Sequence, residues 1–433
     1  MEVPLYPIYR LNSPHTISQL NTFLPLEENP TDIHTVVGLI QDVRFGVSNL
    51  AFPMFRSTFI ALSKGDRNVL LRKTAVLSGS NKNFHSSTPS LQALQRHFDN
   101  YDEGRPRILI TGSLGQLGSG LARVFRQKYG QENVFMSDIR KPSRDITSRG
   151  PYIFADVLDY KCLQKIIVTH RIDWLVHFSA LLSAVAEQNV GLSMKVNIEG
   201  THNVMELANQ YGLRLFIPST IAAFGPESPR NPTPNLCIQR PKTIYGVAKV
   251  HTELLGEYYH HKYGLDFRCL RFPGVLSSDT HPGGGTTDYA IQIFHDALKN
   301  GHYTNYLRPD TRLPMMHIDD CLRSVAEIME MPSEALPQRT YNVTGVSFTP
   351  VELGEEIRKS IPHFMQDYRP DHRQAIAETW PEVFDDTEAQ QDWNWRPEFD
   401  LERMCQVMLD DLRPLYQEPA MKYLRVLTAS CYE

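Results

Sequence analysis

The stretch Arg107–Gly118, RILITGSLGQLG, combines a short apolar run with three regularly spaced glycines. Residues 107–111 have the β-branched and apolar composition of a buried strand, and Gly112, Gly115 and Gly118 then recur at every third position. The following segment, LARVFRQKYG, has the periodicity of an amphipathic helix. A strand, a glycine-rich turn and a helix are therefore predicted in direct succession.

This succession is typical of a dinucleotide-binding site. Glycine lacks the Cβ that would keep backbone away from a pyrophosphate, and the N–H groups at a helix N-terminus attract anions. Asp138 follows the predicted strand NVFMS, about 20 residues after the last glycine, where an acidic residue can bind a ribose. The alternative is a plain turn without a ligand. A P-loop is excluded because no Lys-Ser or Lys-Thr follows Gly118.

Length, charge and cysteine spacing narrow the class of protein. The chain has 433 residues, 41% of them hydrophobic and 21% charged, as in a globular protein of more than one domain. A net charge of -5 argues against nucleic-acid binding, and no apolar run reaches the ~20 residues of a membrane span. The six cysteines are scattered without C-x-x-C pairs, so neither a disulfide framework nor a metal site is predicted.

The N-terminal hundred residues differ from the rest. Residues 1–53 form an extension without a sustained period and stay unassigned. Residues 54–104 are rich in hydroxyl groups, and between positions 54 and 96 seven basic residues face a single acid, Asp66. This composition predicts a mitochondrial transit peptide and hence a location in the matrix; the alternative is a basic linker.

From Arg107 onward, strands and helices alternate. A Rossmann-type, doubly wound parallel sheet with helices on both faces is therefore predicted over residues 105–275. Residues 276–415 are expected to form mainly a smaller α/β substrate lobe over the sheet's C-terminal edge, and residues 416–433 a tail. The expected strands after the first are Asn133–Ser137, Tyr152–Ala155, Trp174–Phe178, Leu215–Pro218 and Phe267–Arg271; helices are expected over Tyr160–His170, over residues 197–212 and from Tyr245.

Tyr245 and Lys249 lie one helical turn apart in TIYGVAKVHTELLGEYY. A tyrosine acts as a base only when its pKa falls below the usual value of about 10, and an ammonium or an oxidised nicotinamide nearby would lower it. In the same helix the apolar positions 247, 250, 254 and 258 are expected to form the buried stripe. Ser219 and Thr220 directly follow a predicted strand, where a hydroxyl can hold a substrate oxygen or simply cap a turn.

Together these features resemble the extended short-chain dehydrogenase/reductase family from Arg107 to about Leu412. The resemblance rests on the glycines, the Tyr–Lys pair and the following further residues: Asp138, Asp156, His177–Ala180, Asn197, Gly200, Thr201 and Arg271. Longer strings, among them PSTIAAFGPESPRN, PGGGTTDYA and RLPMMHIDDCLR, resemble the branch that oxidises L-threonine with NAD+ in animal mitochondria.

The resemblance implies a catalytic role for three residues. Tyr245 would take the proton of the substrate's 3-hydroxyl, Lys249 would lower the pKa of Tyr245 and hold the nicotinamide ribose, and Thr220 would orient the substrate oxygen. The implied amino-acid-binding residues, besides Thr220 and Tyr245, are Ser183, Thr286, Thr287 and Asp288.

The cofactor implied is NAD rather than NADP, because Asp138 would repel a 2′-phosphate, although Arg140 keeps NADP as a minor alternative. Besides Tyr245 and Lys249, the implied cofactor-binding residues are Gly112, Gly115, Gln116, Leu117, Gly118, Asp138, Ile139, Arg140, Asp156 and Val157. The product, 2-amino-3-oxobutanoate, would lose carbon dioxide to give aminoacetone or pass to a coenzyme A-dependent partner enzyme. A homodimer through the Tyr–Lys helix is also implied. His317 stands where relatives often carry tyrosine.

Three other readings compete with this one. A nucleotide-sugar epimerase or dehydratase shares the catalytic framework, but dehydratases typically place Asp-Glu where Ile221 and Ala222 stand. A hydroxysteroid-type oxidoreductase would be expected to have a more apolar substrate loop than GGGTTDYA. A non-catalytic NAD-binding sensor would commonly lack Tyr245 or Lys249, and both are present.

Overall fold

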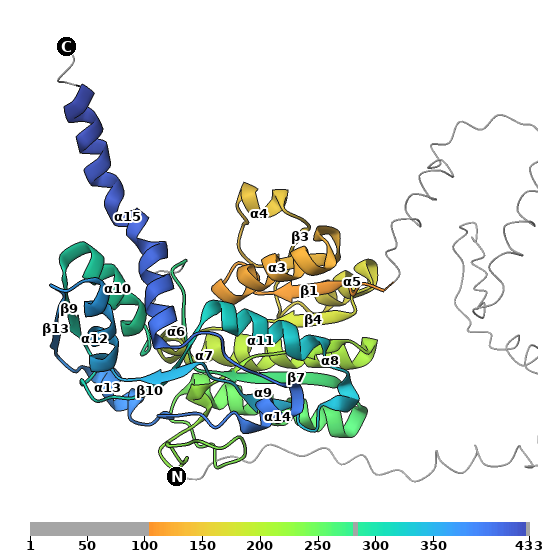
Figure 1. Cartoon of the computed structure of the whole chain (residues 1–433). Coiled ribbons are helices and arrows are strands. Elements are labelled where there is room, and N and C mark those ends of the chain that lie inside the picture. The colour runs from red at the N-terminus through yellow and green to blue at the C-terminus, as the bar shows by residue number, and fades with distance from the viewer. Residues whose placement is uncertain (1–103, 280–284, 430–433) are drawn as a thin grey trace, which may run out of the picture. The chain divides into compact units, whose positions relative to one another are not determined.

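The computed structural model describes residues 104–279 and 285–429, with side chains described up to residue 416 (Figure 1). The predicted extension 1–53 and all but the last residue of the predicted transit peptide 54–104 lie outside the described residues.

The main sheet is parallel throughout and has the strand order β11-β7-β5-β4-β1-β2-β3, with β6 pairing alongside β7. Strand order reverses at β1, and the carboxyl ends of parallel strands at such a point form a crevice where ligands bind. The Rossmann-type prediction is confirmed. The strands are β1 (Ile108–Thr111), β2 (Val134–Asp138), β3 (Tyr152–Phe154), β4 (Trp174–His177), β5 (Arg214–Phe216), β6 (Ser219–Thr220), β7 (Asp266–Phe272) and β11 (Thr340–Asn342).

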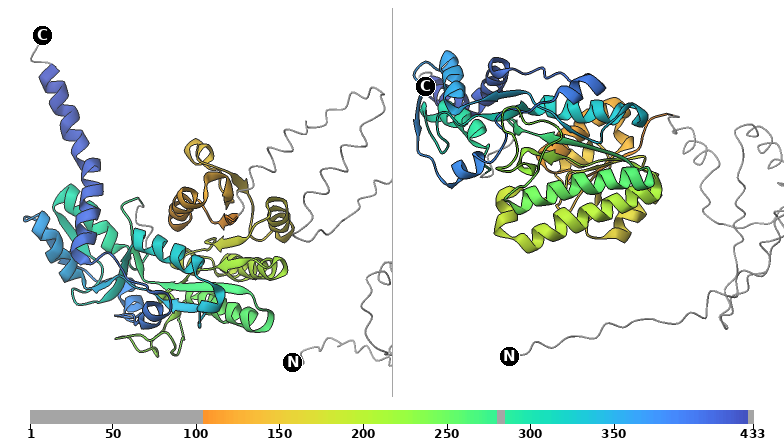
Figure 2. Two further views of the ribbon diagram at one scale, coloured as in Figure 1. Left: turned by 45° about the vertical axis from the view of Figure 1, so that its right-hand side comes forward. Right: turned by 90° about the horizontal axis from the view of Figure 1, so that it is seen from below.

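Helices cover both faces of this sheet. One face is covered by α3 (Gln116–Tyr129), α11 (Ile318–Glu330) and α14 (Thr387–Trp393), and the other by α5 (Tyr160–His170), α8 (Thr201–Tyr211) and α9 (Ile244–Tyr263). Figure 2 shows α8 and α9 side by side below the sheet. Shorter elements on the way are η3 (Gln131–Asn133), α4 (Arg144–Ser148), α6 (Ser183–Gln188), α7 (Val190–Met194), the π-helical η4 (Lys195–Gly200) and η5 (Ile221–Ala223).

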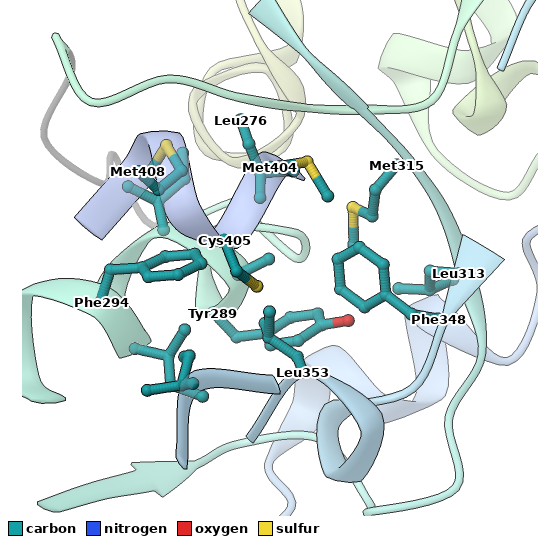
Figure 3. Close-up of a cluster of buried hydrophobic side chains, with 14 of the residues drawn as sticks. Leu276, Tyr289, Phe294, Leu313, Met315, Phe348, Leu353, Met404, Cys405 and Met408 are labelled. Carbon is teal, nitrogen blue, oxygen red and sulfur yellow. The ribbon is translucent and has the colours of Figure 1, made fainter. Parts of the chain in front are cut away.

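A smaller lobe follows β7 and has its own core. Figure 3 shows Tyr289, Phe294, Phe348 and Met404 packed together in this core. It contains β8 (Gly274–Leu276), α10 (Tyr289–Asn300), β9 (His302–Asn305), β10 (Leu313–His317), β12 (Val346–Phe348), α12 (Pro350–Ser360), β13 (Met365–Tyr368), α13 (His372–Ala377) and α15 (Leu401–Ala429), while η6 (Ser333–Ala335) lies between α11 and β11. Helix α11 and strand β11 return to the main sheet, so the segment 276–415 contributes to both the main domain and the smaller lobe. Its predicted end at residue 415 falls inside α15.

The buried stripe predicted for α9 is wrong. Val247, Leu254 and Tyr258 are 46%, 59% and 52% exposed, whereas Lys249 and Glu253 on the opposite side are 6% and 1% exposed. A helical period identifies residues that share a face without saying which face turns inward. Here the inward face lies on β6 and β7, where a small or paired polar residue fits better than a bulky apolar one.

Candidate active site

The glycine-rich turn is built for close approach of backbone. A Cβ on Gly112, whose φ is +66°, would lie 2.5 Å from the Ser179 nitrogen at the end of β4, and one on Gly118 would lie 2.6 Å from the Gly112 carbonyl oxygen. A Cβ on Gly115 would meet only the Gly112 carbonyl oxygen, at 3.3 Å. Helix α3 then begins at Gln116 without a capping side chain. An anion can therefore approach the first N–H groups of α3.

Asp138 at the end of β2 lies directly beside this turn. Its buried carboxylate accepts from the Leu114 backbone nitrogen at 3.0 Å and from the Arg140 backbone and Nε nitrogens at 3.1 and 3.3 Å. The neighbouring Ile139 is exposed, and the Arg140 side chain is 61% exposed. A carboxylate fixed next to the pyrophosphate turn fits the hydroxyls of an adenosine ribose.

Asp156 and Val157 follow β3 at the same edge of the sheet. Asp156 is exposed and its side chain accepts from the Leu158 nitrogen at 2.9 Å, while Val157 is buried against Gly200. The ends of β1, β2 and β3 thus present a glycine cradle, a fixed carboxylate and an apolar contact side by side. These residues fit a dinucleotide.

The three predicted catalytic residues meet where β6 packs on α9. The Thr220 side chain lies close enough to the Tyr245 phenol to lower the pKa of Tyr245. The Lys249 Nζ donates to the Pro218 carbonyl oxygen at 2.7 Å and lies 5.7 Å from the centroid of the Tyr245 ring. Helix α9 starts one residue before Tyr245 because the Thr243 side chain caps it, accepting from the Gly246 nitrogen at 3.1 Å.

Burial dominates the protonation of these groups. It raises the pKa of Tyr245 to about 12, although the Thr220 side chain lowers it, and it lowers the pKa of Lys249 to about 8 against the opposing effects of Cys269 and Glu253. In the chain by itself Tyr245 is therefore a neutral phenol at physiological pH. A further positive charge beside the phenol is needed to make it a base.

Ser183 lies in the first turn of α6, which packs against the beginning of α9. The link between the two helices is Glu187, whose Oε1 accepts from the Ile244 nitrogen at 2.7 Å. The helix that carries Ser183 is thus joined to the residue that precedes Tyr245.

Thr286, Thr287 and Asp288 precede α10 in the smaller lobe. Thr286 is buried, Thr287 packs close to Gly274, and Asp288 accepts from the Gly285 nitrogen at 2.8 Å. Tyr245 packs against the core cluster of this lobe, which includes the adjoining Tyr289. Residues 280–284, which precede these positions, lie outside the described residues.

His317 contributes to packing between the end of β10 and the segment that precedes α15. It ends β10, is 3% exposed and stacks on Phe399 with ring centroids 4.1 Å apart. Its Nδ1 accepts from the Asp319 nitrogen at 3.3 Å, so the ring caps α11. Burial lowers the pKa of His317.

Sequence reasoning missed a buried carboxylate behind the catalytic residues. Glu253 forms an ion pair of 2.8 Å with Arg271 and accepts from Ser219, the neighbour of Thr220. Its position four residues after Lys249 places it on the same side of α9 and was the available signal. His177, one of the residues on which the family resemblance rests, lies nearby without a predicted role. Its Nδ1 lies 2.8 Å from the Thr111 hydroxyl, and burial, with a smaller effect of Lys249, lowers its pKa to about 3.

The fold and this site define a class of protein. Residues 108–344 match the family described as NAD dependent epimerase/dehydratase. The chain belongs to this family, one of the extended short-chain dehydrogenases/reductases, and NAD is its cofactor.

The individual proteins that this chain resembles carry more specific names than the family. The chain is 58% identical over 329 residues to "L-threonine 3-dehydrogenase, mitochondrial" of Sus scrofa, covering 76% of this chain and 85% of the relative. Among solved structures, L-threonine dehydrogenase from Phytophthora infestans is 50% identical with a TM-score of 0.69, covering 71% of this chain and 98% of that one. The enzyme from Clostridium difficile is 41% identical with a TM-score of 0.70, covering 72% and 99%.

Proposed function

We propose that this chain oxidises the 3-hydroxyl of L-threonine with NAD+ to give 2-amino-3-oxobutanoate. The observation that carries the proposal is the contact of Thr220, Tyr245 and Lys249 at the edge of a dinucleotide-binding sheet. The relatives reported above are named as L-threonine dehydrogenases, and these names support the choice of substrate.

Each catalytic group has a separate task. Tyr245 accepts the proton of the substrate hydroxyl, and Thr220 donates a hydrogen bond that holds the same oxygen in place. Lys249, fixed by Pro218, provides a buried cation beside the phenol and a donor for the nicotinamide ribose. Oxidised NAD, when bound, supplies the hydride acceptor and a positive charge that favours the phenolate.

The substrate is a zwitterion, and the proposed residues match its two charges. Hydroxyls of Ser183, Thr286 and Thr287 can donate to a carboxylate, and Asp288 can accept from an ammonium group. Ser183 comes from α6, which contacts α9. Thr286, Thr287 and Asp288 precede α10, a helix of the lobe whose core Tyr245 packs against.

Cofactor selection is assigned to Asp138. The structure holds its carboxylate between the glycine turn and Arg140, where a 2′-phosphate would be repelled. In Asp138→Ala, the ratio of kcat/KM with NAD+ to kcat/KM with NADP+ is expected to fall by about tenfold, because one charged contact is lost. An unchanged ratio would remove the ribose contact from this residue.

The proposal is tested with a substrate panel. Purified protein is offered L-threonine, L-serine and UDP-sugars, each with NAD+, and NADH formation is followed. We expect L-threonine to be the preferred substrate. Conversion of a UDP-sugar without reaction of L-threonine would favour the epimerase or dehydratase alternative instead.

We also propose a mitochondrial matrix location and a coenzyme A-dependent partner enzyme that consumes the product. Relatives named as mitochondrial support the organelle. Within the described residues, no helix combines the length and apolarity needed to cross a membrane.

A homodimer through α9 completes the proposal. Helix α9 exposes Val247, Leu254 and Tyr258. The neighbouring α6 and α7, which contact α9, expose Val185, Val190, Leu192 and Met194. An open groove of about 430 Å³ along η4, α8 and α9 is lined by Met194, Lys195, Ile198, Glu199, His202 and His251. An apolar face of this extent fits a second copy of itself across a two-fold axis.

A further inference from the structure

The residue before β6 and the two residues of β6 are each contacted by a different residue of α9. The three partners on α9 are spaced four residues apart, so they form one row on the inward side of the helix. The pairs are Thr220 with Tyr245, Pro218 with Lys249 and Ser219 with Glu253. The pairs that contain Thr220 and Pro218 act on the substrate oxygen or the phenol in the proposed reaction, while the pair of Ser219 with Glu253 has no such task.

All the hydrogen-bonding capacity of the Glu253 carboxylate is used. This side chain is 1% exposed. Its Oε1 accepts from the Ser219 hydroxyl and from Arg271 Nε at 3.0 Å, and its Oε2 accepts from Arg271 Nη2 and from Gln239 Nε2, both at 2.8 Å. A buried carboxylate with four donors has one low-energy position, so it can serve as a fixed reference point.

Arg271 holds the Glu253 carboxylate in a fixed position. It lies on β7 directly opposite Ser219 in the parallel pairing of β6 with β7. Its Nη1 donates to the Asn235 carbonyl oxygen at 2.6 Å and to Asn342 Oδ1 at 3.1 Å, which ties it to two further segments. Burial lowers the pKa of Arg271, but the effect of Glu253 outweighs that of burial, so the net change is upward and the guanidinium stays charged.

We propose that Glu253 is a positioning residue for the reaction: through Ser219 it sets the register of β6 against α9 and so places the Thr220 hydroxyl against Tyr245. Ser219 and Thr220 are covalent neighbours in extended backbone, so a shift of the first residue displaces the second. Misplacement of a catalytic hydroxyl by about 1 Å can cost about 10²-fold in rate. The inference rests on the proposed function, because the turnover of L-threonine is one of its readouts.

Glu253→Gln is compared with Glu257→Gln in the same assay. Glu257 lies one turn further along α9, is half-buried and accepts from the Thr340 hydroxyl at 2.9 Å, away from β6. We expect Glu253→Gln to lower kcat by roughly 10- to 100-fold and to change KM for L-threonine by less than about twofold. Glu257→Gln should change both by less than about twofold.

The pH profile separates positioning from general loosening of the fold. The titratable or charged neighbours of Lys249 are Tyr245 and Glu253 on α9, Cys269 on β7 and His177 on β4. Because Glu253 raises the pKa of Lys249, its neutralisation lets the lysine lose its proton at lower pH. The alkaline limb of kcat/KM should therefore move to lower pH in Glu253→Gln and stay in place in Glu257→Gln.

Ser219→Ala is the second variant and leaves the buried ion pair intact. It is expected to lower kcat roughly fivefold, since only one of the three links is lost, without moving the alkaline limb. If Glu253→Gln does not fold, this variant decides the matter. Wild-type values of kcat in both variants would overturn the proposal.

Crystal structures of the variants test the register without any substrate. A longer distance between Thr220 Oγ1 and Tyr245 Oη in either folded variant than in the wild type supports the proposal, and an unchanged distance in both overturns it. This readout stays valid if the wild-type protein fails to oxidise L-threonine, a result that would refute the proposed function alone.

Discussion

The two sides of α9 reverse the usual arrangement of a surface helix. The side against the sheet carries Lys249 and Glu253, 6% and 1% exposed, and the side away from it carries Leu254 and Tyr258, 59% and 52% exposed. In most helices of globular proteins the apolar stripe faces the core. On α9 the inward side carries polar groups of the candidate site instead, and these groups are paired with β6, β7 and the residue before β6.

This reversal shows that a stripe of apolar residues marks a surface to be buried without saying what buries it. The core under α9 is filled from the sheet instead: Phe267 of β7 occupies the space that a side chain at position 256 would need. The outward stripe is then left for another molecule, in our proposal a second copy. Each prediction below changes one side of α9 and leaves the other intact.

The largest effect is expected from Tyr245→Phe on the inward side. The variant keeps the ring that packs against the smaller lobe and removes only the hydroxyl that we propose as the proton acceptor. We expect kcat to fall by about 10³-fold, the contribution of a general base, with little change in NADH affinity. Steady-state kinetics and a fluorescence titration with NADH measure the two quantities.

Tyr258→Phe is the matched control for this change. It removes the same hydroxyl from the same helix, but from the exposed outward side. Turnover should stay within about twofold of the wild type. Equal losses in the two variants would mean that the helix as a whole, rather than the Tyr245 phenol, supports the reaction.

Leu254→Asp tests the outward side. In a two-fold dimer each substitution occurs twice, so two charges would be introduced into one apolar contact. We expect the dimer dissociation constant to rise by about 10²-fold, measured by sedimentation, with the fold intact by circular dichroism. Leu415→Asp, at a residue of α15 that is 61% exposed, should leave association unchanged. A wild-type protein that is monomeric throughout would exclude the dimer.

Gly256→Ala probes packing on the inward side. The added Cβ would lie 2.2 Å from an atom of the Phe267 ring, which is fully buried. Such overpacking typically lowers the free energy of unfolding by about 1–3 kcal/mol. In the control Gly191→Ala on α7, the nearest atom would be 4.0 Å away, so no loss is expected. Chemical denaturation of both variants measures the difference, and equal stabilities would contradict the tight contact.

The main fold could be predicted from sequence because it depends on local signals. The predicted strands lie within one or two residues of those observed, and the helix Tyr160–His170 has the predicted bounds. Buried parallel strands are recognisable in the sequence as continuous apolar runs. The turn after β1 is recognisable because its positive φ favours a glycine at position 112. The return of α11 and β11 to the main sheet left no such trace, because their pairing depends on contacts far apart in the chain.

The candidate site combines residues of short motifs with residues that only the fold brings together. Residues that act through a short motif, such as the glycines or Tyr245 with Lys249, are recognisable by spacing. Glu253 was overlooked because its partners Ser219 and Arg271 come from two separate strands. The orientation of α9 was predicted wrongly for the same reason: which side faces inward is decided by β6 and β7 rather than by the helix.

The smallest expected effect concerns the charge buried at Lys249. Burial lowers its pKa to about 8 from the ordinary value of 10.5. Between these two pH values the unfolded chain binds more protons at this position than the folded chain, so this lysine makes the free energy of unfolding rise with pH. Lys249→Met removes that rise. The difference in stability between wild type and variant should therefore shift in favour of the wild type, by on the order of 1 kcal/mol, from pH 8 to 9.5.

Denaturation of the ligand-free proteins at several pH values measures this shift. Lys262→Met, at an exposed lysine near the end of the same helix, serves as the control and should show no dependence of this kind. If the difference in free energy of unfolding between the wild type and Lys249→Met did not depend on pH, water would reach the lysine. The inward side of α9 would then be better solvated than its low exposure indicates. The phenol of Tyr245 would then need less help from a bound cation to lose its proton, because the same water would stabilise the phenolate.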